Sequence, residues 1–158
     1  GCMTGQRYSD YSRISADNIK GDNIIILQKK TKNKAVVPMT DYVREIFNKY
    51  DGRLPEARCI QYFNKAIKVI CRKAGLTDLV TYEEDQGGEI IMVKKEKCDM
   101  VSSHSARRTF ITNTISDKIP ENMIMKLTGH KSSACFMRYN RMTLEDNARA
   151  LAGNGYLS

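Results

Sequence analysis

The chain contains 158 residues, close to the roughly 150 of a typical domain, so we expect one globular unit. Its 26 Lys and Arg residues outnumber its 18 Asp and Glu residues, which gives a formal charge of +8 and predicts an anionic partner such as nucleic acid. The longest apolar run, Ile24 to Leu27, is far shorter than the roughly 18 residues of a membrane span, which excludes a membrane-spanning helix.

The cysteine and histidine content argues against disulfides and structural zinc. The 5 cysteines form no CxxC pair, and the N-terminus carries no secretion signal, so we expect reduced thiols in the cytoplasm. His104 and His130 have no cysteine at ligand spacing. We therefore expect no structural zinc, and since the sequence has no P-loop or acidic metal cluster we also expect no other metal and no cofactor.

The first 52 residues predict a small sheet followed by a helix. Three β-prone stretches, 17–20, 23–29 and 35–38, are separated by Gly21-Asp22 and a polar turn, which predicts a three-stranded antiparallel meander. From Thr40, apolar residues recur at helical spacing as far as Tyr50, and Asp51-Gly52 ends the pattern.

The middle of the chain predicts one helix and one less regular segment. Apolar residues repeat at helical spacing from Ile60 to Ala74, and Gly75 provides the stop. Residues 79–100 flank Gln86-Gly87-Gly88 with β-prone stretches and predict a hairpin or an irregular excursion.

The last third predicts four helices. They span 104–116, 120–128 with Pro120 in the first turn and Gly129 as the stop, 133–139, and 143–151, followed by a polar tail at 153–158. The predicted fold class is α+β and mostly helical, with a small three-stranded antiparallel sheet. No repeat or low-complexity linker marks a second domain.

Short elements in the C-terminal half are candidates for a functional site. His104 and Arg107 are three residues apart at the start of a predicted helix, so both side chains are expected on one face, where the helix dipole favours an anion. The same pair is common on solvated helix faces and identifies no site by itself. Downstream, Gly129-His130 follows a helix, and Tyr139 lies nine residues after His130.

In this order and spacing the motifs resemble the C-terminal half of the tyrosine recombinase, or phage integrase, family. Residues 4–10 are similar to the family's first arginine motif, with Arg7 as its arginine and Gln6 in place of the usual apolar residue. Lys30, eight residues before Pro38, matches the lysine on the family's β-hairpin. The resemblance extends from residue 4 to residue 139.

The resemblance implies a nucleophile and a phosphate clamp. Tyr139 would attack a DNA phosphorus, form a 3′-phosphotyrosine and free a 5′-hydroxyl. Arg7 and Arg107 would hold the phosphate, because a guanidinium donates two parallel hydrogen bonds to it and stays charged.

Three other residues would assist the reaction, two of them by proton transfer and one by hydrogen bonding. Lys30 would be the general acid for the leaving 5′-oxygen, His104 the base or proton shuttle near Tyr139, and His130 a hydrogen-bond donor to a non-bridging oxygen. Three further arginines are expected to contact the DNA backbone or to be structural: Arg108, Arg138 and Arg141.

The implied activity is site-specific DNA recombination, as in integration or excision of a mobile element in a bacterium. The expected partner is double-stranded DNA, on which protomers assemble as a tetramer, and religation needs no cofactor. Residues 1–158 would form the catalytic domain, truncated so that the DNA-binding domain preceding Arg7 in the family is absent. The alternatives are a type IB topoisomerase with the same chemistry and a DNA-binding regulator without catalysis.

Overall fold

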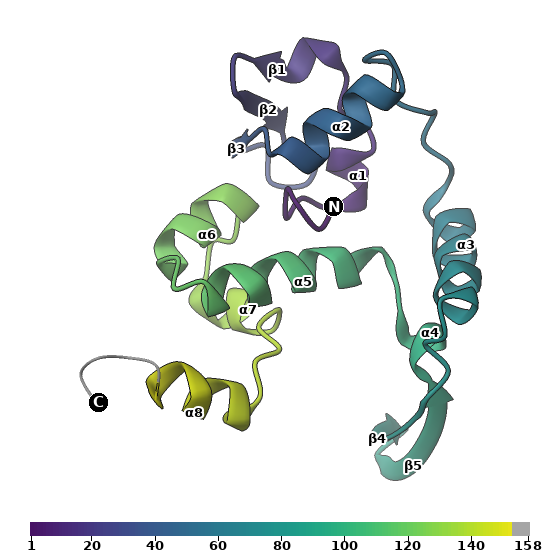
Figure 1. The fold of residues 1–158 in the computed structure, drawn as a ribbon. Helices are drawn as coiled ribbons and strands as arrows, with labels where there is room; N and C mark the ends of the chain where they lie inside the picture. Colours follow the sequence, from purple (N-terminus) through teal and green to yellow (C-terminus); the bar gives the residue numbers. More distant parts are fainter. Residues whose placement is uncertain (153–158) are drawn as a thin grey trace. The chain divides into compact units, whose positions relative to one another are not determined.

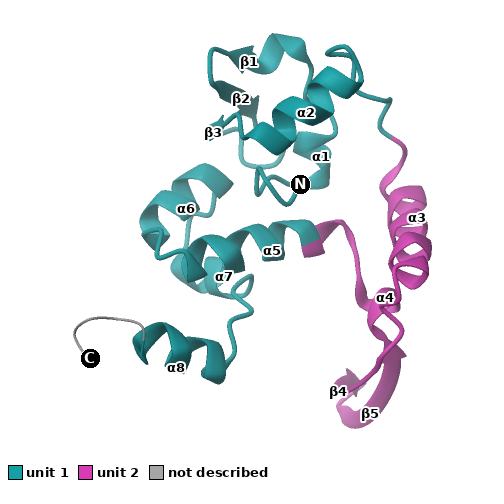
Figure 2. Ribbon diagram, viewed as in Figure 1, with its two compact units in different colours: residues 1–57, 106–158 teal, residues 58–105 magenta. Residues whose placement is uncertain are grey.

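The structure is a computed structural model that describes residues 1–152, so the predicted tail at 153–158 lies outside the described residues. The described chain divides into two compact units (Figure 2). Unit 1 combines residues 1–57 with the residues from 106 onward, and unit 2 is the continuous segment 58–105. The assignment of residues 1–158 to one catalytic domain stays a prediction.

The N-terminal part of unit 1 contains the predicted sheet (Figure 1). After helix α1 (Tyr8–Tyr11) and a 3-10 turn (Ala16–Asn18) come strands β1 (Ile19–Lys20), β2 (Asn23–Leu27) and β3 (Lys34–Pro38). The strands pair antiparallel in the order β1-β2-β3, which confirms the meander. β2 ends at Leu27, two residues earlier than predicted, because Gln28 begins a tight turn.

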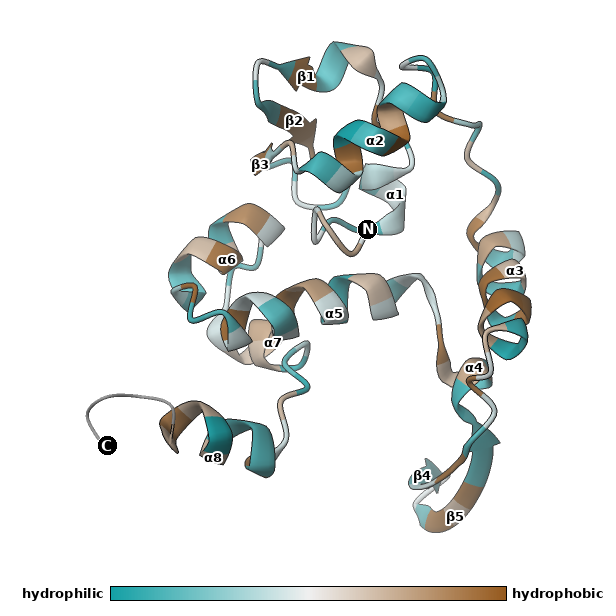
Figure 3. Ribbon diagram, in the orientation of Figure 1, coloured by the Kyte–Doolittle hydropathy of each residue, from teal (hydrophilic) through white to brown (hydrophobic). Residues whose placement is uncertain are grey.

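Buried and exposed side chains alternate along β2 and β3, and the buried ones form the first hydrophobic core. Ile24 and Ile26 of β2 are buried opposite Val37 and Ala35 of β3, whereas Leu27 is exposed. Helix α2 (Asp41–Lys49) covers this layer with Val43 and Phe47, the buried positions of its apolar stripe (Figure 3).

The remaining helices of unit 1 build a second, smaller core. They are α5 (Ser103–Ser116, in unit 1 from residue 106), α6 (Glu121–Thr128), α7 (Ser133–Met137) and α8 (Leu144–Ala152). Ile111, Ile124 and Phe136 form its buried centre. The predicted boundaries hold closely, because Gly129 ends α6 in a left-handed conformation and Ser132 caps α7 by accepting from the Cys135 N–H.

Unit 2 contains α3 (Ile60–Lys73), the hairpin β4 (Leu79–Gln86) and β5 (Glu89–Glu96), and a short helix α4 (Lys97–Met100). The hairpin is the regular alternative of the two predicted for residues 79–100, and Gly87-Gly88 form its two-residue turn with positive φ at both positions. α4 was not predicted, because four residues carry no helical periodicity. Across residues 1–152, no helix is both long and apolar enough to cross a membrane.

Candidate active site

Arg107 on α5 is the buried centre of the site. Its side chain is 0% exposed, with Nη1 donating to the Gly5 carbonyl at 2.9 Å and Nη2 donating to the Thr128 carbonyl at 2.7 Å. Burial, together with the charge of Arg7, lowers the pKa of Arg107 to about 10. The guanidinium therefore stays charged at neutral pH and is held by neutral carbonyl groups.

Gly5 can deliver its carbonyl only because it has no side chain. Its φ is +62°, and an added Cβ would lie 2.3 Å from the Phe110 ring. The Thr-Gly pair of the sequence motif thus has a structural cause, since the backbone passes directly over Phe110 to reach Arg107.

His130 lies against the same guanidinium. Its two ring nitrogens are 3.2 and 3.3 Å from Arg107 Nη2, and its Nδ1 is 2.8 Å from Thr128 Oγ1. Burial, followed by the charges of Arg107 and Arg7, lowers the pKa of His130 to about 4. His130 is therefore neutral at physiological pH.

Tyr139, two residues after α7, completes this cluster. Its ring centroid is 4.9 Å from that of His130, and the Arg107 guanidinium carbon lies 5.4 Å from the Tyr139 ring. The neighbouring Phe136 is fully buried, and its ring centroid lies 5.6 Å from that of His130. Packing of α7 on the second core therefore places the predicted nucleophile beside two other predicted site residues.

Arg7 adds a second positive charge. It precedes α1 in an extended conformation, at the N-cap of that helix. Its charge lowers the pKa of both Arg107 and His130. Within residues 1–152, Arg7 Nη1 and Arg107 Nε are buried without a hydrogen-bond acceptor. Two guanidinium groups with unused donors fit an anion such as phosphate and disfavour a metal cation.

Lys30 and His104 differ from Arg107 in that both are exposed. Lys30 is exposed in the turn between β2 and β3, and among the described residues no hydrogen bond or ion pair joins it to the other five predicted residues. His104 is exposed in the first turn of α5, whereas Arg107 one turn later is buried, so the two side chains differ in burial, and their joint role stays a prediction. Arg138 and Arg141 are exposed and Arg108 is half-buried, and their predicted backbone role stays a prediction.

The model of the Phage integrase family matches residues 2–145. The chain belongs to the phage integrase family. This match and the fold confirm the resemblance to tyrosine recombinases and the predicted α+β fold class. No curated protein matches the chain in sequence comparison at a significant level.

Three solved structures illustrate the shared fold. XerA recombinase has 16% identity and a TM-score of 0.70 over 96% of this chain and 53% of its own. XerH site-specific recombinase, bound to a palindromic difH substrate in a post-cleavage complex, has 13% identity and a TM-score of 0.66 over 96% of this chain and 42% of its own. The catalytic domain of bacteriophage HP1 integrase has 18% identity and a TM-score of 0.55 over 98% of this chain and 79% of its own. The chain thus spans about half the length of XerA.

Several residues that shape this integrase-family site were not predicted. Thr128 supplies a carbonyl to Arg107 and a hydroxyl to His130, and Gly5 supplies the other carbonyl. Asp10, Gln6 and Gln28 are buried polar residues beside the site segments. Backbone acceptors carry no side-chain signature, and only the Thr-Gly pair before Arg7 gave a signal.

Outside the site, one group of side chains in unit 2 has the composition of a metal site. Ligand atoms of Glu96, Cys98 and Asp99 lie within 4.8 Å of one another. Arg72 already forms ion pairs with both carboxylates, at 3.1 Å to Glu96 and 2.9 Å to Asp99. The cation at this position is therefore the protein's own arginine.

Proposed function

We propose that the chain is the catalytic part of a site-specific DNA recombinase that cleaves and religates strands through Tyr139. The observation that carries the proposal is the contact of the buried Arg107 guanidinium with both His130 and the Tyr139 ring. A nucleophile beside a buried cation and an imidazole suits phosphoryl transfer, which needs an attacking group and stabilisation of the charge that develops on the phosphate.

The two arginines form the phosphate clamp in this proposal. Arg107 is fixed by two carbonyls on one side, so its remaining N–H groups keep a constant direction. Arg7 Nη1 and Arg107 Nε supply donors to non-bridging oxygens. Because the Arg107 guanidinium is held by the fold before DNA arrives, it stabilises the extra charge of the transition state without rearranging.

The chemical step exchanges one phosphate ester for another. The Tyr139 oxygen attacks phosphorus, the bond from phosphorus to the 5′-oxygen breaks, and the 3′-phosphate stays on the enzyme. Lys30 protonates the departing 5′-oxygen, and His104 takes the proton of Tyr139. The reverse reaction with another 5′-hydroxyl rejoins the strand, so the ester keeps the bond energy and no net hydrolysis occurs.

His130 serves the clamp as a neutral hydrogen-bond donor. Donation from its Nε2 requires the tautomer whose Nδ1 accepts from the Thr128 hydroxyl, 2.8 Å away. The Thr128 hydroxyl has one proton and also lies 2.7 Å from the Ile124 carbonyl, so it changes acceptor when His130 donates to phosphate.

Double-stranded DNA and further protomers are the proposed partners. The net charge of +8 favours the DNA backbone. Among the similar structures, a lambda integrase tetramer is bound to a Holliday junction. Helix α8 exposes 83% of Leu144 and 56% of Leu151, an apolar surface that suits contact with another protomer in a tetramer. Removing the residues after Arg141 should weaken assembly on DNA and leave the melting temperature of unit 1 nearly unchanged.

Covalent trapping tests the reaction. The substrate is DNA from the flanks of the gene, nicked near the scissile phosphate so that the short fragment with the freed 5′-hydroxyl diffuses away after cleavage. It is incubated with the chain, and the products are separated on a denaturing gel. The expected product is protein linked to a 3′ end. Tyr139→Phe, which keeps the ring packing, should give none, and Tyr62→Phe on α3 should match the wild type. An adduct with Tyr139→Phe would assign the nucleophile to another residue.

A further inference from the structure

Two glutamine side chains form a buried pair beside the site. Gln6 and Gln28 are both 0% exposed, and Gln28 Nε2 donates to Gln6 Oε1 at 2.8 Å. The outer ends of the pair are also satisfied, because Gln6 Nε2 donates to the Leu127 carbonyl at 2.9 Å and Gln28 Oε1 accepts from Thr31 Oγ1 at 2.5 Å. Buried amides are costly unless they are bonded in this way, so the pair has one favourable arrangement.

The pair connects three segments that carry site residues. Gln6 is adjacent to Arg7, Gln28 lies two residues before Lys30, and Leu127 lies three residues before His130. Gly129 packs so closely on this pair that an added Cβ would fall 2.0 Å from Gln28 Oε1. A displacement of Gln28 would therefore also shift the segment of Gln6 and the segment of Gly129.

Gln28 also closes the turn that carries Lys30. Its N–H donates to the Asn33 carbonyl and its own carbonyl accepts from the Lys32 N–H, both at 2.9 Å. Main chain and side chain of one buried residue thus hold the turn at its base. Lys30 itself is exposed at the tip.

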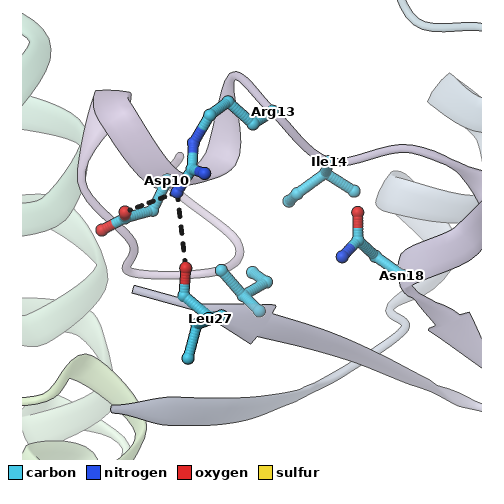
Figure 4. Close-up of a pocket in the computed structure, with 6 residues that line it drawn as sticks. Asp10, Arg13, Ile14, Asn18 and Leu27 are labelled. Carbon is cyan, nitrogen blue, oxygen red and sulfur yellow. Dashed lines mark hydrogen bonds and ion pairs between the residues drawn. The ribbon is translucent and has the colours of Figure 1, made fainter. Parts of the chain in front are cut away.

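A second anchor holds the same turn from α1. Buried Asp10 accepts from the Lys29 N–H at 2.7 Å and from Arg13 Nη2 at 3.3 Å. Arg13 also donates to the Leu27 carbonyl at 3.4 Å, so it bridges α1 and the end of β2 (Figure 4). The turn is therefore tied at Lys29 to the helix that follows Arg7, and at Gln28 to the residue that precedes Arg7.

We propose that Gln28, through its amide pair with Gln6, is a positioning residue that holds the Lys30 turn in register with Arg7 and His130. The proposal rests on the proposed function, in which Lys30 protonates the leaving 5′-oxygen. Gln28 is fully buried, so in this proposal it acts through Lys30 and not by contact with DNA. Its effect is to restrict where the Lys30 ammonium can reach, and a general acid loses most of its benefit when displaced by about 1 Å.

The test compares two leaving groups. Strand cleavage is measured on the nicked substrate and on the same substrate with sulfur in place of the bridging 5′-oxygen. A thiol has a pKa of about 8.5, so a sulfur leaving group departs without protonation and needs no general acid. A variant that only misplaces Lys30 is rescued by sulfur, whereas a variant that damages the phosphate clamp is not.

Gln28→Met keeps the side-chain volume and removes the amide. It should cleave the oxygen substrate at least about tenfold more slowly than wild type and the sulfur substrate within about twofold of it. Lys30→Ala should show the same pattern with a larger loss, and Arg107→Lys should lose activity on both substrates. Gln86→Met, at an exposed glutamine of the unit 2 hairpin, should match the wild type.

Thr31→Val is the second variant, since it removes one hydroxyl from the turn and leaves the Gln6–Gln28 contact intact. It should repeat the pattern in weaker form even where Gln28→Met does not fold. Equal losses on both substrates, or full activity of both variants on the oxygen substrate, would overturn the positioning role. A wild-type chain without a Tyr139-dependent adduct on either substrate would instead refute the proposed function, and this inference with it.

Discussion

Replacing Gly129 by alanine tests whether the link between α6 and the Lys30 turn is as tight as the structure indicates. Gly129 has φ of +71°, and its new Cβ would lie 2.0 Å from Gln28 Oε1 and 2.8 Å from Gln28 Cδ. Gln28 is fully buried, so its amide cannot swing into solvent without breaking its hydrogen bonds to Gln6 and Thr31.

The expected loss of stability has two parts. An alanine in the left-handed region costs about 1 kcal/mol relative to glycine. Displacing Gln28 breaks two hydrogen bonds worth about 1 kcal/mol each and leaves Gln6 Oε1 buried without its donor, at a cost of about 1 kcal/mol more. We therefore expect Gly129→Ala to destabilise unit 1 by about 4 kcal/mol, of which about 3 kcal/mol comes from the contact with Gln28.

Gly52→Ala is the matched control. Gly52 also lies in unit 1, with φ of +74°, but an added Cβ there would have no neighbour within 4 Å. Urea unfolding followed by far-ultraviolet circular dichroism gives both free energies of unfolding. Gly129→Ala should lose about 3 kcal/mol more than Gly52→Ala. In a Gln28→Ala background, where the Gln28 hydrogen bonds are already absent, Gly129→Ala should cost only the roughly 1 kcal/mol of its left-handed backbone. Equal losses for the two alanine variants would refute the reasoning.

Three further predictions concern the site. Arg107→Lys keeps the charge but loses the forked guanidinium that spans the Gly5 and Thr128 carbonyls. Strand cleavage should therefore fall by about a hundredfold or more, while DNA affinity, measured by fluorescence titration, changes little. Equal losses of cleavage and affinity would make Arg107 a docking contact only. In the free chain, NMR should show the His130 imidazole titrating near pH 4. With DNA bound it should titrate at higher pH, because the negative phosphate offsets the positive charge of Arg7 and Arg107. A midpoint near 6.5 in the free chain would contradict its burial. Because the unfolded chain takes up this proton near pH 6.5 and the folded chain does not until about pH 4, stability should also fall as pH drops from 6.5 to 4. Cleavage should persist in EDTA, since Arg7, Arg107 and Lys30 supply the charge that a metal would otherwise provide, and strict dependence on divalent ions would exclude this set.

The elements that sequence analysis located are those with local signatures. The α6 boundary depends on Gly129, the α7 boundary on Ser132, and the sheet on alternating isoleucines and valines, all of which act within a few residues. The short α4 has no such signature. The division into two units also has none, because residues 58–105 differ from their surroundings neither in composition nor by a flexible linker.

The site was predicted by residue type but not by contact. Arg107, His130 and Tyr139 were identified from their spacing, whereas the acceptors of Arg107 are backbone atoms at Gly5 and Thr128, 102 and 21 residues away. A fully buried arginine also contradicts the usual expectation for a charged residue. The Gln6–Gln28 pair was not predicted either, because an isolated glutamine in a sequence is also expected at the surface.

Unit 1 is made of two stretches of the chain with unit 2 between them, and this sets the order in which unit 1 can assemble during synthesis. The sheet and α2 contact one another within the first 54 residues, so this cluster can form as soon as it leaves the ribosome. Unit 2 is continuous and emerges next, whereas Gly5 must wait for Arg107 and Gln6 for Leu127, 121 residues later. The predicted site residues therefore come together only after α7 and Tyr139 have been made, and a nascent chain that stops within unit 2 holds Arg7 and Lys30 without the partners that would complete the site.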